Sequence, residues 1–484
     1  MQTLRSLTDM PAKTLKKQSS ASKQAKATVE KNRTNAITPV SKNNEGLPDG
    51  WKWVRVSSLA ELYRGINYTK DVASDKPTKD GLPILRANNI NGELNFDDLI
   101  YVPKSLIKEE QYIRQGDIVF AMSSGSKHLV GKSAVAKSDF QGSYGAFCAL
   151  LRINEGVDRN YIAYIFKGNS YRKLISEIAK GTNINNLKRE HILNFEVPLP
   201  PVQIQHAIVS KIEELLSELD KGKQQLETAQ QQLKVYRQAV LKWAFEGKLS
   251  ELGRVGLKDD RIMDEAVKGE ILQSANPKNP NSDNELPEGW KWVKVSEISD
   301  VVRGGSPRPA GDPKYYDGTI PFLKVKDITK DSSIYLNSFE YTIKEAGLKK
   351  TRQIKPNTLL LSNSGATLGV PKICMINATM NDGIAAFLNL DERSNLYLYY
   401  FWLSKTRELR NINMGAAQPN LNTDIIKEYK IPYCSFEEQS LVVQQIESRL
   451  SVCDKVEETI NQSLTQAETL RQSILKKAFE GKLV

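Results

Sequence analysis

The chain has 484 residues, 40% of them hydrophobic, which is enough for several folded domains and excludes a chain that is disordered throughout. No run approaches the roughly 18 apolar residues of a membrane helix, and the N-terminus lacks the apolar segment of a signal peptide. The four cysteines show no C-x-x-C spacing, which argues against a zinc site or a disulfide framework. We therefore expect a cytoplasmic protein with buried, reduced thiols.

The net charge of +11 is concentrated near the N-terminus. Residues 1–46 contain nine Lys or Arg against three acidic residues, which leaves only +5 for the other 438 residues. This stretch has few large apolar side chains, so we predict a basic and flexible tail. Two interpretations stay open: a solvated tail without partners, or an arm that contacts phosphates or another protein.

Two short segments occur twice in the chain. Residues 47–54 (LPDGWKWV) return 239 positions later as residues 286–293 (LPEGWKWV), and residues 244–249 (AFEGKL) return 234 positions later as residues 478–483. The chain is therefore a duplicated unit whose ends match and whose middle parts differ in sequence and length. Such a protein is expected to perform one task at two different places.

Each repeat begins with a module in which short apolar runs alternate with Gly, Asn and Pro. We assign these modules to residues 47–200 and 286–434 and predict a compact α+β domain for each. The clearest elements are two strands and one helix per module: residues 117–121, 146–151 and 161–179 in the first, and residues 357–361, 385–388 and 396–411 in the second.

A long helix is predicted after each module, in residues 201–249 and 435–484. In the first, apolar residues recur at steps of four and three, except where Gly222 takes one position: Ile208, Ile212, Leu215, Leu219, Leu226, Ala229, Leu233, Tyr236, Val240 and Trp243. The second follows the same plan with a looser register: Val442, Ile446, Leu450, Cys453, Val456, Ile460, Leu464, Ala467, Leu470 and Ile474. Gly247 and Gly481 are placed to end the two helices.

The two apolar stripes are expected to pack against each other within one chain. The alternatives are that each helix lies on its own module, or that helices of two chains pair. The linker of residues 250–285, with two Asn-Pro dipeptides, is long enough to allow an antiparallel return. We therefore predict an intramolecular antiparallel coiled coil that joins two α+β modules with pseudo-twofold symmetry.

The sequence contains no recognisable catalytic constellation. It has no H-E-x-x-H metal motif, no G-x-S-x-G elbow and no G-x-G-x-x-G fingerprint after a strand. Residues 125–133 resemble a phosphate-binding P-loop, but Ser126 stands where that motif requires glycine. We expect neither a catalytic residue nor a bound metal in this chain.

Polar loops in the middle of each module suit contacts with DNA. Arg and Lys can bond guanine, Asn suits adenine, and Ser, Thr and Lys bind phosphates. The candidates in the first module are Arg64, Arg86, Asn88, Asn89, Ser123, Ser124, Lys127 and His128. Those in the second module are Arg303, Lys324, Lys326, Ser362, Asn363 and Ser364. Taken alone, these loops favour the alternative that they are ordinary polar surface loops.

The order of the repeated motifs carries a resemblance to a known family. L-P-x-G-W-x-W opens each module, an apolar, proline-containing segment leads into each long helix, and A-F-E-G-K-L ends it. This arrangement resembles the specificity subunit of Type I restriction-modification enzymes. Residues 415–421 (GAAQPNL) and 437–439 (EEQ) are similar to further elements of that family. The first repeat departs from them, with Ile184 in place of a glutamine and Ile204-Gln205 in place of Glu-Gln.

The resemblance implies a function without catalysis in this chain. Each module would be a target recognition domain for one half of a split DNA sequence, and the helices would set the spacing between the halves. The helices would also dock two methyltransferase subunits that use S-adenosylmethionine to methylate adenine. Restriction subunits that need ATP and Mg²⁺ would join them, so this chain would carry no cofactor. The rival hypothesis is a protein-assembly scaffold whose two modules bind other proteins.

Overall fold

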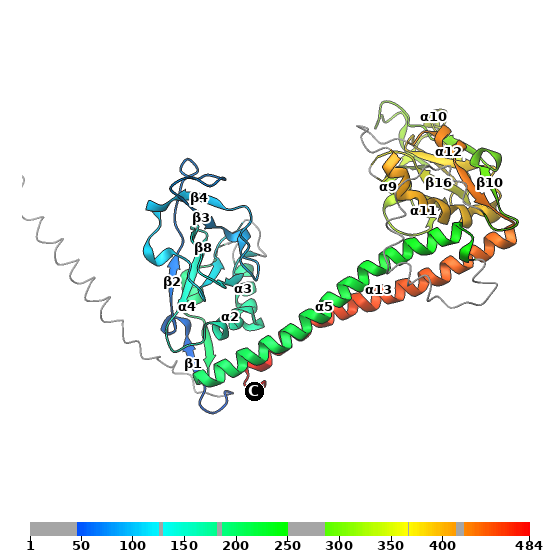
Figure 1. The fold of residues 1–484 in the computed structure, drawn as a ribbon. Coiled ribbons are helices and arrows are strands. Elements are labelled where there is room, and N and C mark those ends of the chain that lie inside the picture. The colour runs from blue at the N-terminus through cyan, green and yellow to red at the C-terminus, as the bar shows by residue number, and fades with distance from the viewer. Residues whose placement is uncertain (1–45, 125–128, 182–185, 250–285, 366, 413–420) are drawn as a thin grey trace, which may run out of the picture. The chain divides into compact units, whose positions relative to one another are not determined.

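The computed structural model describes residues 46–124, 129–181, 186–249, 286–365, 367–412 and 421–484. The chain divides into two compact units, one of residues 1–223 with 465–484 and one of residues 224–464. Each unit holds one α+β module together with parts of two long helices (Figure 1). Most of the predicted basic tail and the linker of residues 250–285 lie outside the described residues.

The first module consists of nine described strands and three helices that precede the first long helix. The strands are β1 (Lys52–Arg55), β2 (Ala60–Arg64), β3 (Gly81–Leu85), β4 (Ile100–Pro103), β5 (Ile118–Ala121), β6 (Ser133–Val135), β7 (Ser143–Tyr144), β8 (Cys148–Ile153) and β9 (Glu196–Leu199). The helices are α2 (Arg159–Lys167), α3 (Asn169–Gly181) and α4 (Arg189–Leu193).

The second module repeats this plan with additional short strands. Its strands are β10 (Lys291–Lys294), β11 (Asp300–Arg303), β12 (Tyr316–Leu323), β13 (Tyr335–Leu336), β14 (Thr342–Ile343), β15 (Arg352–Ile354), β16 (Thr358–Ser362), β17 (Pro371–Cys374), β18 (Ala378–Met380), β19 (Ile384–Leu388) and β20 (Lys430–Tyr433). Its helices are α9 (Val325–Thr329), α10 (Glu345–Leu348), α11 (Asn395–Ile412) and α12 (Thr423–Glu428).

The two modules share the order of their main strands, and the second module adds one edge strand to each sheet. The larger sheet has the order β2-β8-β5-β6 in the first module and β11-β19-β16-β17-β13 in the second. A smaller sheet has the order β4-β3-β7 or β14-β12-β18-β15. Strands β5 and β16 are buried along their whole length, which explains their continuous apolar sequences. The α+β class predicted for each module is confirmed.

One predicted helix is interrupted. The apolar pattern over residues 161–179 predicts a single helix, but the structure divides this stretch into α2 and α3. Gly168 adopts an extended conformation between them, with ψ of 162°, while its amide still donates to the carbonyl of Ile165. The amphipathic pattern continues on both sides of the break, so periodicity alone does not locate it.

A two-stranded sheet closes each module beside its long helix. β1 pairs with β9 so that Trp53 lies opposite Pro198, and β10 pairs with β20 so that Trp292 lies opposite Pro432. The helices α5 (Val202–Phe245) and α13 (Phe436–Phe479) begin three residues after these closing strands. The start of each module therefore lies next to the point where its long helix begins.

Helices α5 and α13 run side by side in opposite directions (Figure 1). In the second unit the Arg237 guanidinium donates to Asp454 at 2.6 Å and to Glu457 at 2.9 Å. In the first unit Arg471 pairs with Asp220. The repeat offset of 234 maps Asp220 onto Asp454 and Arg237 onto Arg471, so one Arg–Asp pair occurs twice. The predicted intramolecular antiparallel pairing is confirmed.

Both units use the same helix register. The residue numbers of the facing pairs (237 with 454, 220 with 471, and 230 with 461) all add to 691. The Arg–Asp pairs are too exposed to stabilise the fold strongly, since surface ion pairs contribute about 0–1 kcal/mol each. Their consequence is specificity, because a shifted register would separate both Arg–Asp pairs at once.

Two residues of the predicted stripe on α13 are misplaced. Val456 is 41% exposed and Leu470 is 51% exposed, so neither faces the partner helix closely. The facing positions fall one residue later, at Glu457 and Arg471, which take part in the ion pairs. The remaining predicted residues are buried or half-buried: Ile208, Ile212, Leu215, Leu219, Leu226, Leu233 and Val240 on α5, and Val442, Ile446, Leu450, Ile460 and Ile474 on α13.

The repeated motifs meet where a helix ends on a module. In the first unit Ile474, Leu475 and Ala478 of α13 belong to the same apolar core as Trp51 and Tyr161. In the second unit Val240, Ala244 and Phe245 of α5 join the core around Trp290 and Tyr397. The phenylalanine of each hexapeptide stacks edge-on against a module tyrosine, with ring centroids 5.5 Å apart for Phe479–Tyr161 and 5.2 Å apart for Phe245–Tyr397.

The glycine that ends each helix is required by this contact. Gly247 and Gly481 have φ of 77° and 65°, in the left-handed region, as predicted for helix-ending residues. A Cβ on Gly481 would lie 2.3 Å from Cγ of Pro48, and one on Gly247 would lie 2.0 Å from Cγ of Pro287. The hexapeptide and the L-P-x-G-W-x-W motif are thus two sides of one docking contact.

Replacement of Gly481 by alanine should destabilise the first unit more than replacement of Gly289, a glycine with φ of 85° and open space around it, destabilises the second unit. Gly289→Ala should cost about 1–2 kcal/mol for the left-handed backbone. Gly481→Ala should cost that amount and a further ~1–3 kcal/mol for overpacking against Pro48. Urea unfolding measures both losses, with hydrogen exchange at β1 and β9 for Gly481→Ala and at β10 and β20 for Gly289→Ala. Equal losses would contradict the docking contact.

Candidate nucleic-acid interface

The first candidate element is an Arg-Gly pair at the end of a strand in each module. Arg64 ends β2 and Arg303 ends β11, and both side chains are exposed. A Cβ on Gly65 would lie 2.0 Å from the carbonyl oxygen of Gly145, and one on Gly304 would lie 2.1 Å from that of Asn381. The glycines therefore let a neighbouring turn approach the strand closely, and the arginines beside them extend from a fixed backbone.

Arg303 belongs to a polar cluster that the sequence did not reveal. Its Nε donates to the carbonyl of Asp382 at 2.6 Å. The Asp382 carboxylate accepts from Ser306 Oγ at 2.6 Å and lies 3.6 Å from Arg308. Residues 381–383 (Asn-Asp-Gly) join β18 to β19. The Asn-Asp-Gly sequence is typical of a turn and could have indicated this cluster, because turns commonly carry exposed functional groups.

The second candidate element is the turn that follows β3 or β12. In the first module Asn89 Oδ1 accepts from the amide of Arg86 at 2.8 Å, and Asn89 Nδ2 donates to the carbonyl of Asp97 at 2.8 Å. In the second, Asp327 accepts from the amide of Lys324 at 2.8 Å and from that of Glu340 at 3.0 Å. Both side chains are 2% exposed and tie the turn to a later segment. The prediction that Asn89 contacts DNA is corrected, since its amide is used inside the fold.

The basic side chains of these turns remain near the surface. Arg86 donates to the carbonyl of Asp98 at 2.6 Å, and the ammonium of Lys324 lies 3.3 Å from the centre of the Tyr341 ring. Asn88 is exposed. Lys326 is exposed too and pairs with Glu340 at 2.7 Å. The hydrogen bond in this pair raises the pKa of Lys326 and lowers that of Glu340. Arg86, Asn88, Lys324 and Lys326 thus remain candidates.

The third candidate element differs between the modules. Ser123 and Ser124 are half-buried after β5, whereas Lys127 and His128 lie outside the described residues. In the second module Ser364 is half-buried, but Ser362 and Asn363 are 0% exposed. Ser362 Oγ donates to the carbonyl of Thr367 and accepts from the amide of Val370. Direct contact of Ser362 and Asn363 with DNA is therefore a wrong prediction, because the fold encloses both side chains.

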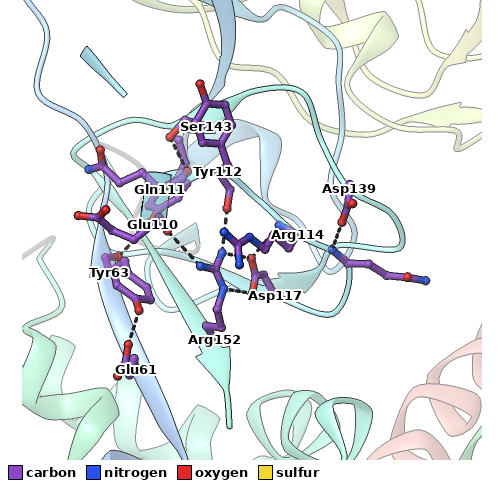
Figure 2. A network of polar contacts seen from close by, with 12 residues as sticks. Glu61, Tyr63, Glu110, Gln111, Tyr112, Arg114, Asp117, Asp139, Ser143 and Arg152 are labelled. Carbon is purple, nitrogen blue, oxygen red and sulfur yellow. Dashed lines mark hydrogen bonds and ion pairs between the residues drawn. The ribbon is translucent and has the colours of Figure 1, made fainter. Parts of the chain in front are cut away.

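An ion pair between Arg152 and Asp117 supports the segment of Glu110, Gln111 and Tyr112 (Figure 2). Arg152 holds the Asp117 carboxylate with two parallel hydrogen bonds of 3.0 and 2.7 Å, and it also donates to the carbonyls of Glu110 and Tyr112. From that segment Gln111 Nε2 donates to the carbonyl of Arg64 at 2.9 Å. The ion pair thus positions the backbone from which the Arg64 side chain extends.

Replacing Asp117 by asparagine should loosen this support. It leaves the half-buried Arg152 guanidinium without a full carboxylate partner, which should cost about 2 kcal/mol or more of unfolding free energy. Asp139→Asn is the matched control, because Asp139 is exposed and accepts one bond from the amide of Gln115. That change should stay within about 0.5 kcal/mol. Thermal unfolding of both variants measures the two losses of stability. Equal losses would contradict a supporting role of the Arg152–Asp117 ion pair.

A family model described as Type I restriction modification DNA specificity domain matches the chain twice, over residues 48–228 and 287–466. The chain belongs to this family. Each match covers one α+β module together with the first part of its long helix. The duplicated segment of the sequence therefore corresponds to two copies of this specificity domain, in agreement with the sequence resemblance.

Individual relatives agree with the family over nearly the whole chain. The StySPI specificity subunit of Salmonella potsdam is 32% identical over 454 residues, which cover 91% of each chain. The EcoKI specificity subunit of Escherichia coli K12 is 31% identical over 452 residues, or 90% of each chain. Among solved structures, the HsdS subunit from Thermoanaerobacter tengcongensis has a TM-score of 0.54 at 19% identity, over 91% of this chain and all of that one. A chain from a Type I system solved to study complex assembly has a TM-score of 0.65 at 19% identity, over 90% of this chain and 99% of that one.

Two glutamines that match the family's Glu-Gln element lie at the starts of the long helices in this specificity subunit. Gln205 and Gln439 lie 234 residues apart, are almost fully buried, and donate at 2.8 and 2.9 Å to the carbonyls of Pro200 and Cys434. They hold the first turn of α5 and of α13 to the preceding segment, so the Ile204-Gln205 variation keeps the residue that makes the bond. Ile184 and most of residues 415–421 lie outside the described residues.

Other groups in the described parts of the chain point to no separate chemistry. All four cysteines are free and buried, as predicted, and burial raises the pKa of the Cys148 thiol to about 12. No His, Cys, Asp and Glu side chains cluster in a way that could hold a metal ion there. Within the same residues, no helix is long and apolar enough to span a membrane.

Proposed function

We propose that this chain is the DNA-binding subunit of a Type I restriction-modification complex, in which each α+β module contacts one half of a split DNA sequence. The observation that carries the proposal is that two modules share a backbone frame but present different side chains at equivalent places. Arg86 and Asn88 in the first module correspond to Lys324 and Lys326 in the second, around the equivalent buried residues Asn89 and Asp327. Two such surfaces would recognise two different sequences.

Helices α5 and α13 would determine the spacing between the two half-sites and bind two methyltransferase subunits. Exposed apolar side chains on α13, namely Val452, Val456 and Leu470, support a role of its outer face in docking. S-adenosylmethionine, ATP and Mg²⁺ would be bound by the methyltransferase and restriction subunits, and this chain would supply recognition without catalysis. Family membership favours this function over a protein-assembly scaffold.

Co-expression of the chain with its methyltransferase subunit, followed by mapping of methyladenine in genomic DNA, tests the proposal. The expected pattern is one motif made of two short fixed sequences at a constant separation. A stable and active complex that methylates a continuous motif, or no defined motif, would refute the assignment of one half-site to each module.

Arg64→Ala and Arg303→Ala form a matched pair of tests, because they remove equivalent exposed arginines from the two modules. Each variant should relax the sequence requirement in one half-site only, with a loss of about 1–3 kcal/mol in discrimination if the arginine contacts a base. The methylation motif of each variant complex reports the effect. Relaxation of both half-sites by one substitution would show that the modules do not act separately.

A further inference from the structure

Phe147 is an unusually exposed aromatic residue in the first module. Its side chain is 68% exposed, more than that of any other large hydrophobic residue in the described parts of the chain. It directly precedes β8, whose Cys148 and Leu150 face one apolar core and whose Ala149 and Leu151 face another. The strand is thus fully used for packing, while the residue before it projects into solvent.

The backbone of Phe147 is fixed from two sides. The amides of Met122 and Ser123 both donate to its carbonyl, at 2.8 and 3.1 Å. Cys148 closes a turn by donating to the carbonyl of Gly145 at 2.8 Å, and Gly65 donates to the carbonyl of Cys148 at 3.1 Å. The turn therefore lies between the end of β2 and the end of β5. These bonds fix the backbone position from which the exposed ring extends.

The surroundings of the ring are those of the candidate interface. Arg64 lies opposite Ala149 in the sheet, and Ala149 is two residues after Phe147 in the chain. Ser123 and Ser124 follow β5 on the other side. The backbone that carries the exposed ring is thus bonded to the segment after β5, with its two serines, and lies beside the strand end that carries Arg64. This combination matches the edge of a base pair in the major groove, where the methyl group of thymine adjoins hydrogen-bonding groups.

The second module has the same backbone contact but no ring. The amide of Asn363 donates to the carbonyl of Gly383 at 3.0 Å, and Gly304 donates to Ile384 at 2.9 Å, as Ser123 and Gly65 do in the first module. A Cβ at Gly383 would lie 2.6 Å from Val325 and 2.9 Å from Ser364 Oγ. The second module is therefore crowded at Gly383, the position where the first module exposes the side chain of Phe147.

We propose that Phe147 contacts a base in the half-site of the first module by packing against the C5-methyl group of a thymine. The inference deepens the proposed function and rests on it, since it assumes that this face of the module contacts DNA. It assigns to the first module an apolar contact that the second module cannot make. The exposed ring would lose its contact with water only in the DNA complex, which favours the bound state.

Uracil substitution tests this contact directly, because uracil pairs as thymine does and lacks only the methyl group. The complex of the full chain with methyltransferase subunits is titrated with duplexes of its mapped motif, in which each thymine is replaced in turn. One thymine in one half-site should show a loss of about fourfold in affinity, the factor expected for one buried methyl group. In Phe147→Ala the same replacement should have no effect.

Phe96→Ala is the matched control, because Phe96 is also exposed in the first module but packs against Phe140 at 5.1 Å between ring centroids. That variant should keep the fourfold uracil effect. Phe147→Leu, which keeps an apolar side chain, should keep part of it and guards against a folding defect in the alanine variant.

Three outcomes would overturn the inference: no thymine sensitive to uracil replacement in the wild-type complex, an unchanged uracil effect in Phe147→Ala, or a folded Phe147→Ala chain that no longer binds methyltransferase subunits. The last result would identify Phe147 as a protein contact. Failure of the proposed function is distinguishable, because the wild-type complex would then show no split motif at all.

Discussion

The structure depends on an exchange of helix ends between the two sequence repeats. The core of the first module includes Ile474 and Ala478, which end the second repeat, and the core of the second includes Val240 and Ala244, which end the first. Neither repeat contains its own complete core. This dependence explains why the module-opening and helix-ending motifs are repeated together, since each pair forms one contact surface across the two repeats.

The same architecture separates what must stay constant from what can change. Gly65 and Gly304 allow the same close backbone approach, and Asn89 and Asp327 hold the same turn. The groups exposed by this frame differ, from a phenylalanine at position 147 to a glycine at position 383. A protein that binds different sequences with its two modules needs such a division, because changes in exposed side chains then leave the fold intact.

Apolar pattern and repetition predicted the modules, the long helices and their antiparallel pairing, because burial of apolar surface dominates those features. The same signals failed where hydrogen bonds and ion pairs determine which side chains are buried or face the partner helix. Glu457 and Arg471 occupy facing positions on α13 that hydrophobic periodicity assigned to Val456 and Leu470. Residue type likewise could not distinguish exposed Asn88 from buried Asn89, because both are asparagine and only the tertiary hydrogen bonds separate them. Phe147 was not among the predicted DNA contacts, because the sequence placed it inside a strand over residues 146–151.

The central claim is that each module recognises its own half-site independently of the other. The most direct measurement uses a chain in which residues 286–434 are replaced by a second copy of residues 47–200, with both long helices unchanged. If the claim holds, the methylated motif changes from an asymmetric sequence to an inverted repeat of the half-site of the first module. A motif that keeps the original second half-site would contradict the claim.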